Sequence, residues 1–164
     1  MRAISWTAGL VILAVALWIA VSSLFPSDVV TSHYKTMSEA REGHLLARGW
    51  LPDILPASSR DIRTVNNLDL NLSDGEFSFK PQDAAGFVSR MQPYKATPAQ
   101  PESIEPLVAK MRGKGFKSYS FIDGDMFWLF LCKAESGYCE YTMWMAQANK
   151  RLESDALKTT RASS

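Results

Sequence analysis

The sequence is poor in the residues that catalytic and metal sites most often use. It contains only two histidines and two cysteines, and no G-x-S-x-G, P-loop or H-E-x-x-H motif occurs in it. His33 and His44 lie far from Cys132 and Cys139 in the sequence, so no ligand set with zinc-site spacing is present. From these absences we predict no catalytic residue, no metal and no cofactor, and we favour a protein that is not an enzyme.

The sequence also lacks an excess of positive charge. Apart from Arg2, it has 17 Lys and Arg against 17 Asp and Glu, since the whole chain has 18 and 17. A nucleic-acid partner requires a basic surface, and electrostatic binding to anionic lipid requires a cluster of basic residues. We therefore expect neither a nucleic-acid partner nor a polybasic attachment to lipid.

Charge is completely absent from Ala3 to Phe25. These residues would form a helix of roughly 34 Å at about 1.5 Å per residue, which is long enough to cross a bilayer. A cleaved signal peptide is the alternative, because small residues near Ala20 and Ser22 could form a cleavage site. The apolar core is long for a signal peptide, so we favour an anchor in residues 1–25. Arg2 before the run predicts a single pass through the plasma (inner) membrane with a cytoplasmic N-terminus.

The remaining chain has one domain's worth of residues. We expect a tether in 26–35, an exported α+β domain in 36–146 and a C-terminal helix or tail in 147–164. An exported domain is in an oxidising compartment, where Cys132 and Cys139 can form a disulfide. Free thiols are the alternative, and the C-x6-C spacing does not match a redox C-x-x-C motif.

Alternating apolar residues predict a small antiparallel sheet. Residues 61–80 form a β-hairpin with its turn at Ser73-Asp74-Gly75, and 116–145 form a three-stranded meander. Pairing Cys132 with Cys139 places Trp128 opposite Met143 and predicts a disulfide between neighbouring strands. A turn at Asp123-Gly124 would pair Phe121 with Met126.

Two or three helices are expected to pack on this sheet. Thr36-Met37-Ser38-Glu39 has the form of a capping box before a helix over 37–48, closed by Gly49. Further helices are predicted over 81–91 and 103–112. The proline-stiffened apolar segment 50–56 is expected to pack on the core, or to form a docking surface around Trp50.

One segment resembles a known group of sequences. Residues 48–62 read RGWLPDILPASSRDI, followed by NLDLN at 67–71. This pattern is similar to a segment shared by small bacterial membrane-anchored envelope proteins to which no activity is assigned. The resemblance implies an exported, anchored domain. It also singles out a possible interaction surface of five residues: Trp50, Arg60, Asp61, Asn67 and Asp69. Alternatively, residues 56–61 simply turn the chain into the first strand.

The sequence therefore favours a membrane-anchored envelope protein that acts through contact with another envelope protein, with the membrane bound through residues 3–25. One alternative is a periplasmic domain that binds a small ligand or lipid, with Trp128 and Trp144 under the loop 92–101. Another is an immunity-type protein that protects its own envelope from a toxin.

Overall fold

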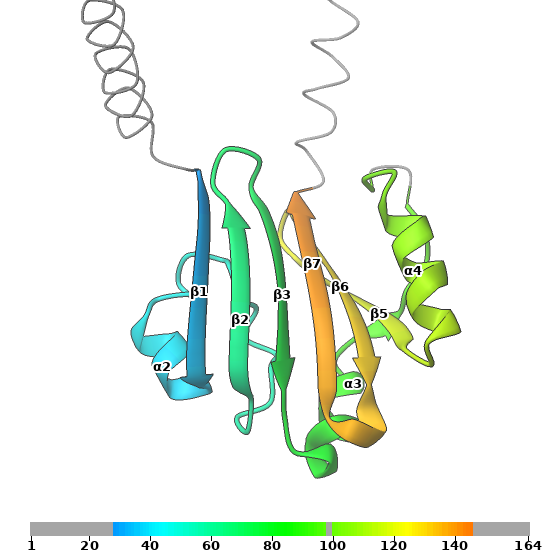
Figure 1. Cartoon of the computed structure of the whole chain (residues 1–164), viewed down its shortest axis with the longest axis horizontal. Helices are drawn as coiled ribbons and strands as arrows, with labels where there is room; N and C mark the ends of the chain where they lie inside the picture. Colours follow the sequence, from blue (N-terminus) through cyan, green and yellow to red (C-terminus); the bar gives the residue numbers. More distant parts are fainter. Residues whose placement is uncertain (1–27, 98–99, 146–164) are drawn as a thin grey trace, which may run out of the picture.

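The computed structural model describes residues 28–97 and 100–145. In these residues the chain forms an α+β domain around one antiparallel sheet of seven strands, in the order β1-β2-β3-β7-β6-β5-β4 (Figure 1). The predicted anchor in 1–25 and the predicted helix or tail in 147–164 lie outside the described residues. No helix within the described residues has the length and apolar character needed to span a bilayer.

The strands are β1 (Val29–Thr36), β2 (Arg60–Asn67), β3 (Leu72–Ser78), β4 (Gln92–Pro93), β5 (Lys117–Asp123), β6 (Met126–Lys133) and β7 (Tyr138–Met145). The helices are α2 (Met37–Glu42), α3 (Ala84–Val88) and α4 (Ile104–Gly113), with 3-10 turns η1 (Pro81–Asp83) and η2 (Ala134–Ser136). The predicted hairpin and meander are joined into one sheet because β3 pairs with β7.

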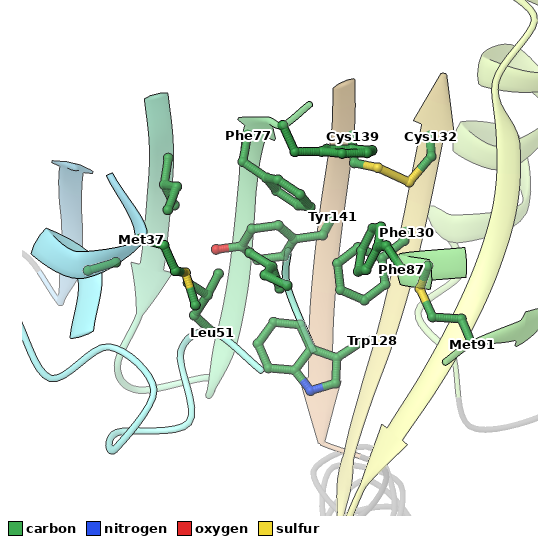
Figure 2. Close-up of a cluster of buried hydrophobic side chains, with 14 of the residues drawn as sticks. Met37, Leu51, Phe77, Phe87, Met91, Trp128, Phe130, Cys132, Cys139 and Tyr141 are labelled. Atoms are coloured by element: carbon green, nitrogen blue, oxygen red, sulfur yellow. A yellow bond between two sulfur atoms is a disulfide. The ribbon is translucent and has the colours of Figure 1, made fainter. Parts of the chain in front are cut away.

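The sheet has two different faces. On one face, α2, α3 and the segment 43–59 cover a core that runs from Ile62 on β2 to Trp128 and Phe130 on β6 (Figure 2). On the other face, α4 packs on Phe127, Leu129, Leu131 and Trp144, so it covers only the β5–β7 half. Face-on, α4 lies beside the right half of the sheet, and no helix of the described residues lies over β1–β3 on this side (Figure 1).

The meander is confirmed, with one shift in register. Cys132 pairs with Cys139 and Trp128 with Met143, as predicted, and the two cysteines form a disulfide. Between β5 and β6, however, Phe121 pairs with Trp128 and not with Met126. The loop consists of Gly124 and Asp125, with Gly124 at a φ of 58° in the first loop position, where a two-residue hairpin turn can require glycine. The shift of two residues leaves every side chain on its predicted face.

The predicted turn of the 61–80 hairpin is wrong. The turn lies at residues 68–71, and Ser73, Asp74 and Gly75 are inside β3. Gly75 is a mid-strand glycine because a Cβ there would lie 2.3 Å from the Arg63 carbonyl oxygen and 2.7 Å from the Tyr141 ring. The actual turn is held by Asn67, whose Oδ1 accepts a hydrogen bond of 3.0 Å from the Leu70 amide.

The predicted tether of 26–35 is also wrong over most of its length. Residues 29–36 form β1, which pairs antiparallel with β2 along its whole length. The β-branched residues of the VVT run suit an extended strand beside another strand, and this pairing outweighs the absence of a strict alternation. The folded domain therefore begins at residue 29, not at 36.

The helix predicted over 37–48 is shorter than expected. The Thr36 hydroxyl accepts from the Glu39 amide at 3.2 Å, and the Glu39 carboxylate reaches back to the Lys35 amide at 2.7 Å. α2 nevertheless ends at Glu42, because Gly43 is its C-cap and His44 takes a positive φ of 58°, which does not continue a helix. The following segment packs on the core as predicted, with Leu51 and Leu55 buried.

Candidate functional site

β1 is a long and exposed edge of the sheet. It has eight residues, six of them exposed, and within the described part of the chain no strand pairs with its outer side. The opposite edge is β4, which is only two residues long and includes Pro93. Short strands and prolines are the usual protection of sheet edges against strand addition. β4 has this protection and β1 does not.

The backbone groups that β1 presents outward follow from its pairing. The Asp28 carbonyl accepts from the Leu68 amide at 2.8 Å, so it faces the strand β2. Because backbone groups alternate along an antiparallel pair, the even-numbered residues of β1 face β2 and the odd-numbered residues face outward. The Lys35 amide agrees with this assignment, since it bonds to Glu39 outside the sheet. Thr31 and His33 thus direct their N–H and C=O groups away from the sheet.

Next to this edge lies the half of the sheet that α4 does not cover. We call it the open face; in two rows across the strands it consists of Thr31, Val65, Asp74, Thr142 and of His33, Arg63, Glu76, Glu140. These side chains are exposed or half-buried. The open face is polar but includes apolar surface such as Val65, which is the mixture found at many protein-binding surfaces.

The polar groups of the open face are linked to one another. Arg63 Nη1 lies 3.0 Å from Glu76 Oε1, and the Tyr138 hydroxyl donates to Glu76 Oε2 at 2.6 Å. Partial burial, together with the nearby carboxylates of Glu76 and Glu140, raises the pKa of Tyr138 above its ordinary range. Tyr138 therefore stays a neutral donor at every physiological pH.

The five residues singled out from the sequence are not brought together. Arg60 and Asp61 lie at one end of β2, and Asn67 at the other, so roughly 23 Å separates them at about 3.3 Å per residue. Trp50 is half-buried against the core on the face opposite the open face. They do not form one surface.

Each of the four polar residues in this set interacts with nearby residues or shapes the local backbone. Asp61 has a φ of 51° at the irregularity in β2, and its carboxylate is 3.9 Å from His33 Nε2. Asn67 caps the β2–β3 turn, as described above. Asp69 lies beside Asp28, whose negative charge raises the pKa of Asp69. Arg60 is exposed and pairs through its backbone with Thr36 and Ser78.

The sequence does not predict β1, because residues 26–35 directly follow the apolar run and are expected to form a tether. The available signal was the concentration of β-branched and aromatic residues in VVTSHYKT, which is typical of strands. It was outweighed by the position of this segment directly after the apolar run.

A pocket of about 380 Å³ lies on the other face, between residues 46–53 and the β5–β6 turn. Arg48, Asp53 and Asp123 provide its charged groups, and Asp53 also bonds to Arg41 at 2.6 Å. Trp128 lies at its base, and no group within 28–97 or 100–145 accepts a hydrogen bond from its buried Nε1. Trp144 is buried on the opposite face, so the two tryptophans do not form a joint platform.

No group of three or more His, Cys, Asp or Glu residues is placed to hold a metal ion within the described ranges. The disulfide between Cys132 and Cys139 indicates an oxidising, extracytoplasmic location.

Comparison with known proteins gives one match. Residues 28–78 are similar to the YbbD head domain family. This stretch corresponds to β1, α2, β2 and β3, so it starts with the edge strand and ends with the strand that joins the meander. It agrees with β1 being part of the folded domain. Searches of curated proteins and of solved structures found no match to the chain.

Proposed function

We propose that the protein is an extracytoplasmic binding domain, held at the plasma membrane by residues 3–25 with its N-terminus in the cytoplasm, and that it acts by binding an extended segment of another envelope protein along β1. The observation that carries this proposal is the exposed, proline-free edge of eight residues. An extended segment placed there would gain main-chain hydrogen bonds from Thr31 and His33.

The open face provides the side-chain part of the same interaction. A strand added to β1 places alternate side chains next to Thr31 and His33, and therefore beside Val65 and Arg63 in the next strand. The partner that fits this surface presents alternating small apolar and polar residues. An immunity-type role is the case in which this partner is a toxin.

A photo-crosslinking amino acid at Thr31 in living cells tests the proposal, with the same amino acid at Gln92 on the other edge as the matched control. We expect a discrete crosslinked protein from position 31 and none from position 92. Absence of any crosslinked protein at Thr31, Ser32 and His33 would contradict strand addition at β1.

Thr31→Pro gives a sharper test, because it removes an outward N–H and leaves the bonds to β2 in place. The crosslink or co-purification should then be lost while the protein remains folded. Thr31→Ala is the control, since it removes the side chain but keeps the N–H. Equal loss in both variants would show that the main chain is not what the partner recognises.

The second candidate function is binding of a small polar ligand. It is favoured by the pocket that Trp128 lines, because the buried Nε1 of Trp128 has no hydrogen-bond acceptor among the described residues. An acceptor atom on such a ligand could pair with Trp128 Nε1, and Arg48 would favour a negative charge. Native mass spectrometry of the purified full chain tests this, since a bound small molecule would appear as a defined added mass. Arg48→Ala should reduce that mass peak.

A further inference from the structure

All six exposed large apolar side chains of the described residues lie toward one end of the sheet. We call this the proximal end, defined by Val29, Asn67, Leu72 and Met145; the distal end is defined by Thr36, Arg60, Ser78 and Tyr138. Ile122 is 65% exposed, Leu70 49% and Leu68 47%. The complete set is Val29, Val30, Val65, Leu68, Leu70 and Ile122.

The strand register places these side chains in the terminal rows and loops of the sheet. Val29 and Ile122 stand in the same row across the strands, at opposite ends of it. Leu68 and Leu70 are in the β2–β3 turn, which projects beyond that row (Figure 1). The distal end, in contrast, carries charged residues such as Lys35, Arg60 and Lys80 at its surface.

The sequence places the uncharged run next to this end. Only Pro26 and Ser27 separate Phe25 from Asp28. Three residue steps reach at most about 11 Å, so the proximal end lies within that distance of residue 25. Because β1 occupies 29–36, no longer tether is available to hold the domain away from a membrane.

We propose that the proximal end rests on the surface of the bilayer, with Leu68, Leu70 and Ile122 inserted among the lipid headgroups. This inference rests on the proposed anchoring by residues 3–25. Apolar side chains gain free energy when they leave water for the headgroup and acyl boundary. Two hairpin tips and the anchor then give three points of contact, which fixes the orientation of the domain and not only its distance.

The charge of the proximal end selects the lipid. Asp28, Asp69, Asp123 and Asp125 lie at this end, and Arg48 of the adjacent segment lines the same pocket as Asp123. Four carboxylates disfavour an anionic surface, so the matching headgroups are zwitterionic, with an ammonium group that can approach the aspartates. The strands then run along the membrane normal. β1 and the open face then stay accessible from the side. The eight residues of β1 extend roughly 26 Å away from the membrane at about 3.3 Å per residue.

Site-directed spin labelling of the full chain in phosphatidylcholine nanodiscs tests this. The native cysteines are joined in the disulfide, so Ile122→Cys or Leu70→Cys adds the single reactive thiol. Gln82→Cys, on η1 at the distal end, is the matched control. We expect labels at 122 and 70 to be severalfold less accessible to a water-soluble nickel chelate, relative to oxygen, than the label at 82. Equal accessibility at all three positions would overturn the proposal.

A paired variant separates this proposal from the anchoring on which it rests. Leu68→Asp with Leu70→Asp should raise nickel access at position 122 severalfold, whereas Gln82→Asp with Ser136→Asp should leave it unchanged. Alkaline carbonate extraction reports the anchor independently. If the chain stays in the membrane pellet but the label at 122 is accessible to nickel, the contact of the proximal end with the bilayer is refuted and the anchor is not. A chain that leaves the pellet refutes the anchor, and the proposal with it.

Discussion

The two halves of the sheet share the same rows of residues but use them differently. The row that contains Thr31, Val65 and Asp74 in the β1–β3 half continues into Thr142 and then Leu129. Leu129 is fully buried under α4, whereas Val65 is 42% exposed. The central strand β6 is thus buried and apolar on both faces, whereas β2 exposes polar side chains on one of its faces. The β5–β7 half therefore provides stability, and the β1–β3 half provides accessible surface.

The cores under the two halves also differ in chemistry. The β6–β7 pair brings together the rings of Trp128, Phe130 and Tyr141, with centroids 5.6 to 6.4 Å apart (Figure 2). The corresponding inner face of β2 and β3 includes three buried polar residues, Thr64, Asn66 and Ser73. Their hydrogen bonds require a fixed geometry but contribute less free energy than burial of aromatic rings.

Trp128→Ala should have the largest effect on stability. Trp128 is fully buried, and truncating such a ring costs about 3–5 kcal/mol of unfolding free energy because a cavity remains. Val65→Ala, the control on the open face, should change it by less than about 0.5 kcal/mol. Urea denaturation of both variants measures the difference. Similar losses would mean that the open face is covered in the folded protein.

Removal of the disulfide should have the next largest effect. Closing a loop of eight residues contributes about 2.5 kcal/mol in the chain-entropy treatment. Cys132→Ala with Cys139→Ala should therefore lower the unfolding free energy by about that amount. Reductant should give a comparable loss in the wild type and none in the double variant. A loss from reductant in the double variant would show that the effect does not come from this bond.

Asn66→Ala tests the polar core of the β1–β3 half. The Ser73 hydroxyl donates to Asn66 Oδ1 at 2.7 Å, and both side chains are buried. Truncation leaves Ser73 without this acceptor and should cost about 1–3 kcal/mol. Ser73→Ala in addition should recover part of the loss, because no unpaired hydroxyl is left behind. A double-mutant cycle in urea measures this coupling. Strictly additive losses would contradict a direct interaction.

Sequence patterns predicted the two halves unequally. The β6–β7 pairing could be predicted to the register, because its cysteines and aromatic residues depend on pairing between neighbours in sequence, whereas the predicted β5–β6 register was wrong by two residues. The turn of the other hairpin could not be predicted, because Gly75 is required by the Tyr141 ring of a distant strand. β1 was missed for a similar reason, since its pairing with β2 spans about thirty residues of chain.

The candidate site was predicted less well than the fold. Resemblance singled out Trp50, Arg60, Asp61, Asn67 and Asp69, but two of these shape β2 and its turn, and Trp50 packs on the core. The edge of β1 has no motif of its own, because what it offers is backbone. Only the position of a strand in the sheet order shows that its backbone groups are available.

Asp69→Asn should have the smallest effect, and its sign is opposite to that of the other variants. The Asp28 charge raises the pKa of Asp69, so the ionised pair destabilises the fold at neutral pH. Removing one charge should raise the thermal midpoint slightly at pH 7. The gain should vanish as the pH falls through the range in which aspartates protonate, because the wild type then loses the same repulsion.

Asp28→Asn is the matched control for this last variant. It should give the same small gain, and the double variant should give no more than either single one, since one repulsion is removed in each case. Thermal scans from pH 3 to 8 at low salt measure these shifts. Independent gains that add would show that the two carboxylates do not interact. In the orientation proposed above the same aspartates face the membrane, so phosphatidylglycerol in the nanodiscs should enlarge the gain.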